Sequence, residues 1–342
     1  MRVVVLGGTG YLGSRLVAAL SAVKDVEVVA ASRRGALAVD VTKRETYARL
    51  EGADVVVDLT DATSTPPDAL IGWCLERGLT VIEATSDAPC VERLHAAFAA
   101  KGLPGRLVLG GGIFTGVSNL LGRAMADAAK ANALVLGIAS SPFSGAGAGT
   151  VELMVQSLAV RPVRYVHGGR VEAQLERGPV LDFGDARRPT VRASFAEPFM
   201  LARSTGAADV DVYFAPKPGF LAGAFTALPA WLVRARWYQA FLRGYFTVLR
   251  RWLLGGRGTA VELLVEAAGP RGKAVGRVTT RDGMRAGAFA LAAMAEAVAA
   301  QRDWTGVRFI DDVTALTPVL ARANALAGEA LLAFSSVEGG AA

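Results

Sequence analysis

The stretch VVVLGGTGYLGSRL, residues 3–16, constrains the fold of this chain more than any other. An apolar run of buried-strand length stops at a glycine-rich turn, and apolar residues then recur at helical spacing from Tyr11 onward. Between the two, residues 8–13 read G-x-G-x-x-G, the pattern of a dinucleotide-binding turn between a strand and a helix. We expect its N–H groups and the positive end of the helix to bind a pyrophosphate. A glycine-rich turn without a ligand is the simpler alternative.

The glycines of this turn have separate expected roles. Gly8 permits a tight turn, Gly10 lets a phosphate approach the backbone where a Cβ would otherwise lie, and Gly13 lets the helix pack closely on the strand. The cofactor-binding residues predicted in the turn are Gly7, Gly8, Thr9, Gly10, Tyr11 and Leu12.

Strand and helix patterns alternate through the first 118 residues. Apolar runs at 2–6, 26–31, 37–41, 53–60, 79–85 and 105–110 are typical of buried strands, and helical patterns separate most of them. Strands that are apolar throughout and alternate with helices indicate a parallel sheet covered on both faces. The sequence therefore predicts an α/β fold with a doubly wound Rossmann sheet over residues 1–118.

The end of the second predicted strand indicates which dinucleotide is bound. An NAD-binding chain usually places a carboxylate there, whereas this chain has Ser32, Arg33 and Arg34. Two guanidinium groups suit a 2′-phosphate, so the expected cofactor is NADP(H). A solvated basic turn is the alternative.

Further cofactor contacts are expected at the carboxyl ends of later strands, where ligands of open α/β sheets bind. Asp40 and Val41 would border the adenine, and Leu59 and Thr60 would follow the ribose on the nicotinamide side. Thr85 follows the next strand end. Ordinary turn chemistry is the alternative explanation for all five residues.

Three stretches carry a family resemblance: VVVLGGTGYLGSRL, VIEATSDAP and LVLGGGIFTGVSNLLGRAMA. Together they resemble the saccharopine dehydrogenase-like oxidoreductases over about the first 130 residues, and residues 141–158 are similar to the start of that family's second domain. The resemblance implies a nicotinamide cofactor and a second α+β domain that shapes the substrate pocket. It also implies that a C-terminal helical segment, residues 306–342, returns to the first domain. Members act on C–N bonds of amino-acid conjugates and imines, and some relatives on lipid-like enoyl groups.

The second domain is predicted over residues 119–305. Strand patterns there indicate a mostly antiparallel sheet, with a hairpin at 259–283 and an alanine-rich helix at 284–301. Thr150 is a plausible N-cap of a helix. Because sheets of this kind often pair between subunits, we expect a homodimer.

No catalytic residue is identified by the sequence. Tyr165, His167 and Tyr213 are weak candidates for a proton donor. Tyr213 lies four residues before Lys217, the spacing of the catalytic pair in extended short-chain dehydrogenases. However, Pro216 opposes the helix that this pair requires, and the residues before it alternate like a strand. With only two histidines and no metal-like cysteine spacing, no metal site is expected.

Composition narrows the classes of protein and partner. The hydrophobic fraction of 52% and the charged fraction of 20% are those of a chain that forms cores. The net charge is +6, but the basic residues are scattered, so no nucleic-acid partner is expected. The strand pattern at the start leaves no room for a signal peptide, and with two cysteines a cytoplasmic location is expected.

Residues 220–254 differ from the rest of the chain in being rich in aromatic residues and arginine, with Pro229 dividing them. Three interpretations stay open: a dimer or domain interface, the lining of a pocket for an apolar substrate, and a membrane-surface segment. The longest uncharged piece is too short to span a bilayer.

Taken together, these patterns predict an NADPH-dependent oxidoreductase. It would reduce an imine or an activated C=C bond of a small organic metabolite, an apolar one if residues 220–254 line the pocket. Two alternatives stay open: an NADP-binding sensor protein without catalysis, and a membrane-associated lipid enoyl reductase.

Overall fold

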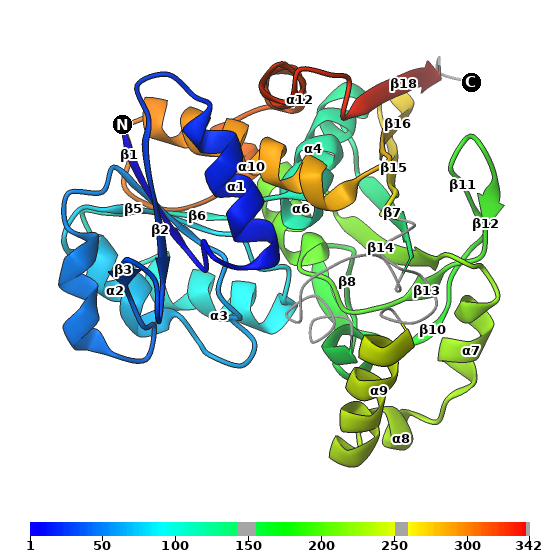
Figure 1. The fold of residues 1–342 in the computed structure, drawn as a ribbon. Helices are drawn as coiled ribbons and strands as arrows, with labels where there is room; N and C mark the ends of the chain where they lie inside the picture. Colours follow the sequence, from blue (N-terminus) through cyan, green and yellow to red (C-terminus); the bar gives the residue numbers. More distant parts are fainter. Residues whose placement is uncertain (142–154, 250–258, 340–342) are drawn as a thin grey trace. The chain divides into compact units, whose positions relative to one another are not determined.

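The structure is a computed structural model that describes residues 1–141, 155–249 and 259–339 (Figure 1). The chain forms two compact units. The first consists of Met1–Leu120 and Met284–Leu331, and the second of Leu121–Gly283 and Leu332–Ala342. The predicted N-cap Thr150 and residues 250–254 of the aromatic segment lie outside the described residues.

Seven parallel strands form the sheet of the first unit, in the order β17-β6-β5-β4-β1-β2-β3. This order places the topological switch point between β1 and β4, as in a doubly wound nucleotide-binding fold. The predicted fold class is thereby confirmed for this unit. The strands are β1 (Arg2–Leu6), β2 (Glu27–Ser32), β3 (Leu37–Ala38), β4 (Val55–Asp58), β5 (Thr80–Glu83), β6 (Arg106–Leu109) and β17 (Gly306–Phe309).

Helices cover both faces of this sheet (Figure 1). On one face lie α1 (Tyr11–Ser21) and α10 (Gly283–Ala300), and on the other α2 (Asp68–Glu76) and α3 (Ala88–Phe98). The central strands are fully buried, as the continuous valine runs of β1 and β4 require. The shorter helices of this unit are η1 (Arg44–Leu50), η2 (Ile113–Val117), α11 (Ile310–Val313) and α12 (Leu316–Ala327).

The second unit contains a sheet of nine strands among the residues described, in the order β10-β13-β14-β7-β15-β16-β18, with β8 paired to β14 and β9 paired to β8. Only β14 and β7 pair in parallel, so the sheet is mostly antiparallel, as predicted. The strands are β7 (Ala133–Ser140), β8 (Val163–Val166), β9 (Gly169–Glu172), β10 (Glu176–Arg177), β13 (Val191–Arg192), β14 (Asp209–Pro216), β15 (Val261–Gly269), β16 (Gly272–Thr280) and β18 (Ala333–Gly339).

The remaining elements of the second unit are helical, apart from one short hairpin. The hairpin pairs β11 (Leu181–Asp182) with β12 (Arg187–Arg188). The helices are α6 (Glu197–Thr205), α7 (Leu221–Ala227), α8 (Ala230–Arg234) and α9 (Arg236–Leu249), while α4 (Ser118–Ala129) crosses the boundary between the units.

Two features of the predicted domain division differ from the structure. The chain rejoins the first unit at Met284 and not at residue 306, because α10 packs there against the glycines that follow β6; Leu291 Cδ1 would lie 2.8 Å from a Cβ at Gly111. The C-terminal segment 306–342 is also not only helical. It supplies β17 to the first sheet and β18 to the edge of the second.

Helix α10 is the one helix among the described residues that is long and apolar enough to cross a membrane. Two thirds of this 18-residue window (67%) is buried inside the protein. A core helix of a folded unit passes the same test, and the contacts of α10 are those of a core helix.

Candidate functional site

The turn between β1 and α1 is packed so closely that only glycine fits at three positions. Gly7 has φ +71°, a conformation that side chains disfavour. A Cβ at Gly8 would lie 2.9 Å from Ala30 Cα on β2, and a Cβ at Gly13 would lie 2.2 Å from Gly7 O. These contacts hold the amino end of α1 against the sheet at the switch point, as the sequence pattern predicts.

Gly10 differs from the other three glycines because it faces open space. A Cβ there would meet one atom within 4 Å, Gly7 O at 3.0 Å. Gly10 is also the N-cap of α1, and it has no side chain to bond the amides of the first turn. A cradle with this shape and these free donors fits a pyrophosphate. Thr9, Tyr11 and Leu12 complete the predicted contact set.

At the end of β2, Ser32 is half-buried, and Arg33 and Arg34 are exposed in the turn that follows. In the described part of the chain, no carboxylate lies within 4.0 Å of either guanidinium to form an ion pair. The two cations are therefore available to an anion at the carboxyl edge of the sheet.

Asp40, predicted to border the adenine, is a carboxylate that interacts electrostatically with Arg33. Its carboxylate accepts hydrogen bonds from Thr42 Oγ1 at 2.7 Å and Thr42 N at 2.9 Å, which lower the pKa of Asp40 below its usual value. The charge of Arg33 contributes a smaller lowering of this pKa. Val41 is buried, and its carbonyl oxygen accepts from Tyr47 Oη.

A buried carboxyl pair, which the sequence reasoning missed, lies at the carboxyl ends of β4 and β5. Asp58 and Glu83 are direct neighbours in the parallel register, and each side chain is 1% exposed. Asp58 Oδ1 accepts from Thr60 N and Thr60 Oγ1, and Glu83 Oε1 accepts from Thr85 N. Leu59, between Asp58 and Thr60, donates its N–H to Leu6 O at 3.1 Å, so it is held next to the glycine turn.

Burial determines the protonation of this pair. It raises the pKa of Glu83 well above its usual value, and the negative charge of Asp58 raises it further. The pKa of Asp58 is also raised by burial, although the bonds from Thr60 oppose this. Within the described residues, Asp58 Oδ2 and Glu83 Oε2 have no hydrogen-bond partner. A proton held by Glu83 and donated to Asp58 would satisfy both oxygens.

The acidic ends of the runs VVVD and TVIE were the available signal for this pair. In a parallel sheet, the ends of adjacent strands lie side by side.

The three candidate proton donors lie in the second unit and are not brought together. Tyr165 on β8 pairs with Val210 of β14, so it lies on one face of the sheet, whereas Tyr213 lies on the other. His167 is exposed in the turn after β8, and its N–H donates to Asp209 Oδ1 at 2.8 Å. Tyr213 belongs to strand β14, as the prolines around it predict, and not to a catalytic helix with Lys217.

Tyr213 is poorly suited to release a proton. It is 6% exposed, and its Oη accepts a hydrogen bond from Arg192 Nη2 at 2.9 Å. Burial raises the pKa of Tyr213, and the charge of Asp211 adds to this, whereas Arg192 lowers it by less.

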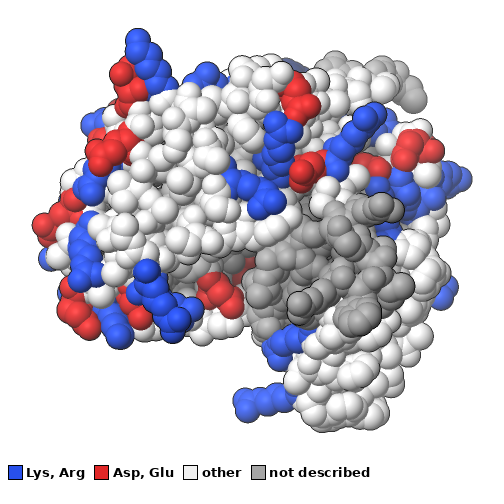
Figure 2. Space-filling model, viewed as in Figure 1, with Lys and Arg blue, Asp and Glu red and all other residues white. Residues whose placement is uncertain are grey.

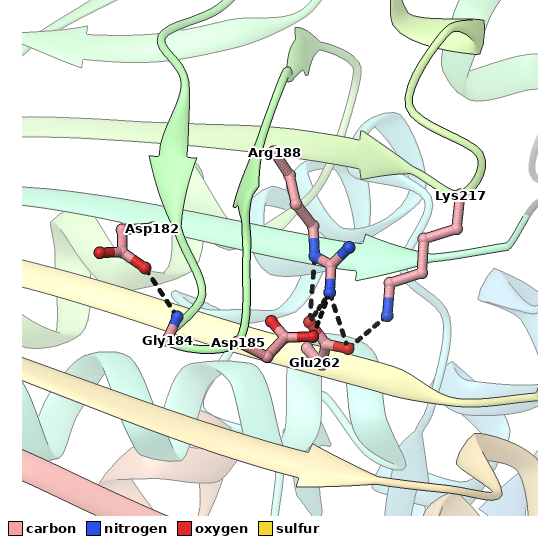
Figure 3. Close-up of polar contacts among 6 residues, drawn as sticks. All are labelled: Asp182, Gly184, Asp185, Arg188, Lys217 and Glu262. Atoms are coloured by element: carbon pink, nitrogen blue, oxygen red, sulfur yellow. Dashed lines mark hydrogen bonds and ion pairs between the residues drawn. The ribbon is translucent and has the colours of Figure 1, made fainter.

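A second polar cluster lies on the same sheet face as Tyr213 (Figure 3). Glu262 on β15 accepts from Arg188 Nε at 3.2 Å and also pairs with Lys217. Arg188 Nη2 reaches Asp185 Oδ2 at 2.6 Å, in a turn that is closed by the bond from Gly184 N to Asp182. Two cations and two carboxylates thus balance one another, with Arg188 and Glu262 largely buried.

No protein-family model matches the chain, and no curated protein matches it. Its structure is similar to that of C. glutamicum DAP dehydrogenase in complex with DAP, at 14% identity and a TM-score of 0.48, over 92% of this chain and 94% of that one. It is also similar to dipicolinate-bound dihydrodipicolinate reductase from Paenisporosarcina sp. TG-14, at 11% identity and a TM-score of 0.39, over 92% and 99%. Aspartate dehydrogenase from Thermotoga maritima matches at 12% identity and a TM-score of 0.38, over 84% and 92%.

At these identities and TM-scores, the similarities carry no argument about what this chain binds or converts. The three structures are not named as saccharopine dehydrogenase-like proteins. The resemblance to that family therefore stays a prediction.

Proposed function

We propose that this chain is an NADPH-dependent reductase that transfers hydride to an imine or an activated C=C bond of a small organic metabolite. The observation that carries the proposal is the pairing of two features at one sheet edge. An open cradle lies at Gly10, and two arginines without an ion-pair partner among the described residues follow β2. The first suits a pyrophosphate and the second a 2′-phosphate.

Bound NADPH would supply the hydride, and the residues of the chain would supply position and electrostatics. Reduction of an iminium needs little acid catalysis, so the scattered tyrosines and the exposed His167 do not contradict this proposal. The carboxyl pair Asp58–Glu83 excludes water at the strand ends, because both side chains are buried.

Replacing both Arg33 and Arg34 by alanine tests the cofactor assignment. Removing two charge-assisted contacts from a partly exposed site should weaken NADPH binding by about 2–3 kcal/mol, roughly 30- to 150-fold. NADH binding should barely change, since NADH has no 2′-phosphate. Calorimetric titration of both nucleotides measures the two affinities.

The matched control is Lys24→Ala with Lys101→Ala, which removes two positive charges from loops that precede β2 and β6, at the amino ends of the strands of the same sheet. It should leave both affinities unchanged. Equal weakening of NADPH and NADH by the arginine variant would contradict the NADP assignment. Turnover is followed by NADPH oxidation with cyclic imines and enoyl thioesters. Tight binding without turnover on either class would favour a sensor over an enzyme.

A further inference from the structure

The exposed face of helix α9 is apolar, which reverses the usual orientation of a surface helix. Trp237, Phe241, Tyr245 and Val248 recur at intervals of three or four residues, and each is exposed. Trp237 and Phe241 are 66% and 58% exposed. Their rings form a row along the helix through Tyr238, with centroids 5.6, 5.9 and 6.0 Å apart.

Exposure of these rings does not result from loose packing of the helix. The opposite side of α9 is anchored by Leu242, which is buried in a core with Val233 and Phe225. Trp231 of α8 and Phe220 before α7 are also exposed, at 71% and 73%. Trp237, Phe241, Tyr245 and Val248 therefore form one side of an anchored helix, called the aromatic face below.

The sequence interval that contains the aromatic face carries charge of one sign. No aspartate or glutamate occurs between Asp211 and Glu262 in the sequence. The same interval carries one lysine and six arginines: Lys217, Arg234, Arg236, Arg243, Arg250, Arg251 and Arg257. In Figure 2, the surface over α7 to α9 is white, with blue atoms at its edge. An apolar face on a segment whose charged residues are all cations is complementary to an anionic partner with an apolar interior.

We propose that the aromatic face binds the surface of an anionic lipid bilayer. With 14 residues, α9 is too short to span the hydrocarbon core, so it would lie in the interface with its rings inserted and its arginines among the headgroups. Tryptophan and tyrosine are the residues favoured at that depth. A second copy of the chain is disfavoured as the occupant, because the charged residues of this segment are all positive and two such segments would repel each other. This inference does not depend on the reaction proposed above.

Co-sedimentation with vesicles tests this proposal. The full chain should bind vesicles of equimolar phosphatidylglycerol and phosphatidylcholine, and binding should fall with added salt and with pure phosphatidylcholine. Trp237→Ser with Phe241→Ser should lower the partition coefficient at least about tenfold, through loss of inserted apolar area. Arg234→Glu with Arg236→Glu should lower it by a similar factor on the anionic vesicles only.

The control is Phe334→Ser with Val337→Ser, which removes two exposed apolar residues from β18 of the same unit. It should bind vesicles like the unmodified chain. The proposal is wrong if the unmodified chain does not bind anionic vesicles, or if the Trp237 and Phe241 variant binds them equally well. Sedimentation velocity tests the alternative that a second copy of the chain binds the aromatic face. A dimer that this variant dissociates, without vesicle binding by the unmodified chain, would assign the face to a second copy.

Discussion

Burial raises the pKa of both Glu83 and Asp58 in the first unit, and this makes its stability depend on pH. The pKa of each carboxyl is raised by burial, so the folded chain holds a proton at a pH where the unfolded chain has released it. Stability therefore falls as the pH rises above the ordinary pKa of a carboxylic acid, and the loss is absent below it.

Glu83→Gln should remove the part of this dependence that comes from Glu83, and the part from Asp58 should remain. The amide can donate to Asp58 and still accept from Thr85 N, so the folded geometry is kept. We expect the free energy of unfolding to rise by roughly 1–3 kcal/mol at pH 7 and to change little at pH 4. Urea denaturation across that pH range measures it. Glu76→Gln, at an exposed position of α2, is the control and should show neither effect. A gain of equal size at both pH values would show that the pair does not hold the proton.

Gly10→Val should abolish dinucleotide binding while the first unit stays folded. The branched side chain would occupy the open space beside the N-cap, which is where the pyrophosphate is proposed to lie. The free energy of unfolding should fall by only about 1 kcal/mol, since the backbone of Gly10 is in an ordinary extended conformation. Calorimetry with NADPH and thermal unfolding test the two parts. Gly72→Ala in α2, where the added Cβ would contact Phe98 at 3.5 Å, should leave the NADPH affinity unchanged and raise the free energy of unfolding by up to about 1 kcal/mol. Unchanged NADPH affinity in folded Gly10→Val would refute the placement of the phosphate.

At the residue scale, the sequence predicted the glycines that a short loop requires, and it did not predict contacts between residues that are far apart in the chain. Gly7, Gly8 and Gly13 are required by contacts inside a short loop, and the loop is contiguous in the chain. The partner of Glu83 is 25 residues away, so the pair appears only once the strand register is known.

In helix α9, buried residues contribute to the stability of the fold, whereas the exposed aromatic residues should contribute little. Leu242→Ala should destabilise the second unit by about 2–4 kcal/mol, because it removes buried methyl groups from the core. Trp237→Ala, five residues earlier, should change stability by less than about 1 kcal/mol, since that ring is mostly exposed. Denaturant unfolding of both variants tests this contrast. Similar losses in the two would mean that the aromatic face is buried in solution.

Long elements with a clear period were predicted and short edge elements were not. The hairpin of β15 and β16 and the helix α10 follow the expected ranges. Strand β17 has four residues and only one of them is buried, so its sequence, GVRF, shows no pattern of a core strand. It becomes a strand by pairing with β6, which the local sequence does not encode.

At the scale of the whole molecule, each unit is built from two separate pieces of chain. A chain ending at Leu331 would lack β18 and expose the edge of β16, along seven paired residues. We expect such a truncation to aggregate more readily and to unfold its second sheet earlier, while NADPH binding by the first unit is kept. Hydrogen exchange of β16 and nucleotide titration measure these effects. Loss of nucleotide binding together with the sheet would mean that the two units do not fold separately.

The division into units could be predicted only in part. The alternation of strands and helices ends near residue 118, close to the observed break at Leu120. The return at Met284 could not be predicted, because α10 is alanine-rich on all sides and its sequence does not indicate which sheet it covers.

The seventh strand of the first sheet has a consequence for the order in which the protein is made. Residues 2–109 supply six neighbouring strands early in synthesis, but β17 emerges from the ribosome almost two hundred residues later. Until then, the outer edge of β6 has no partner, and the glycines after it lack the cover of α10. During synthesis, the sheet of the first unit therefore keeps an open edge and an uncovered face until the entire middle of the chain has been translated.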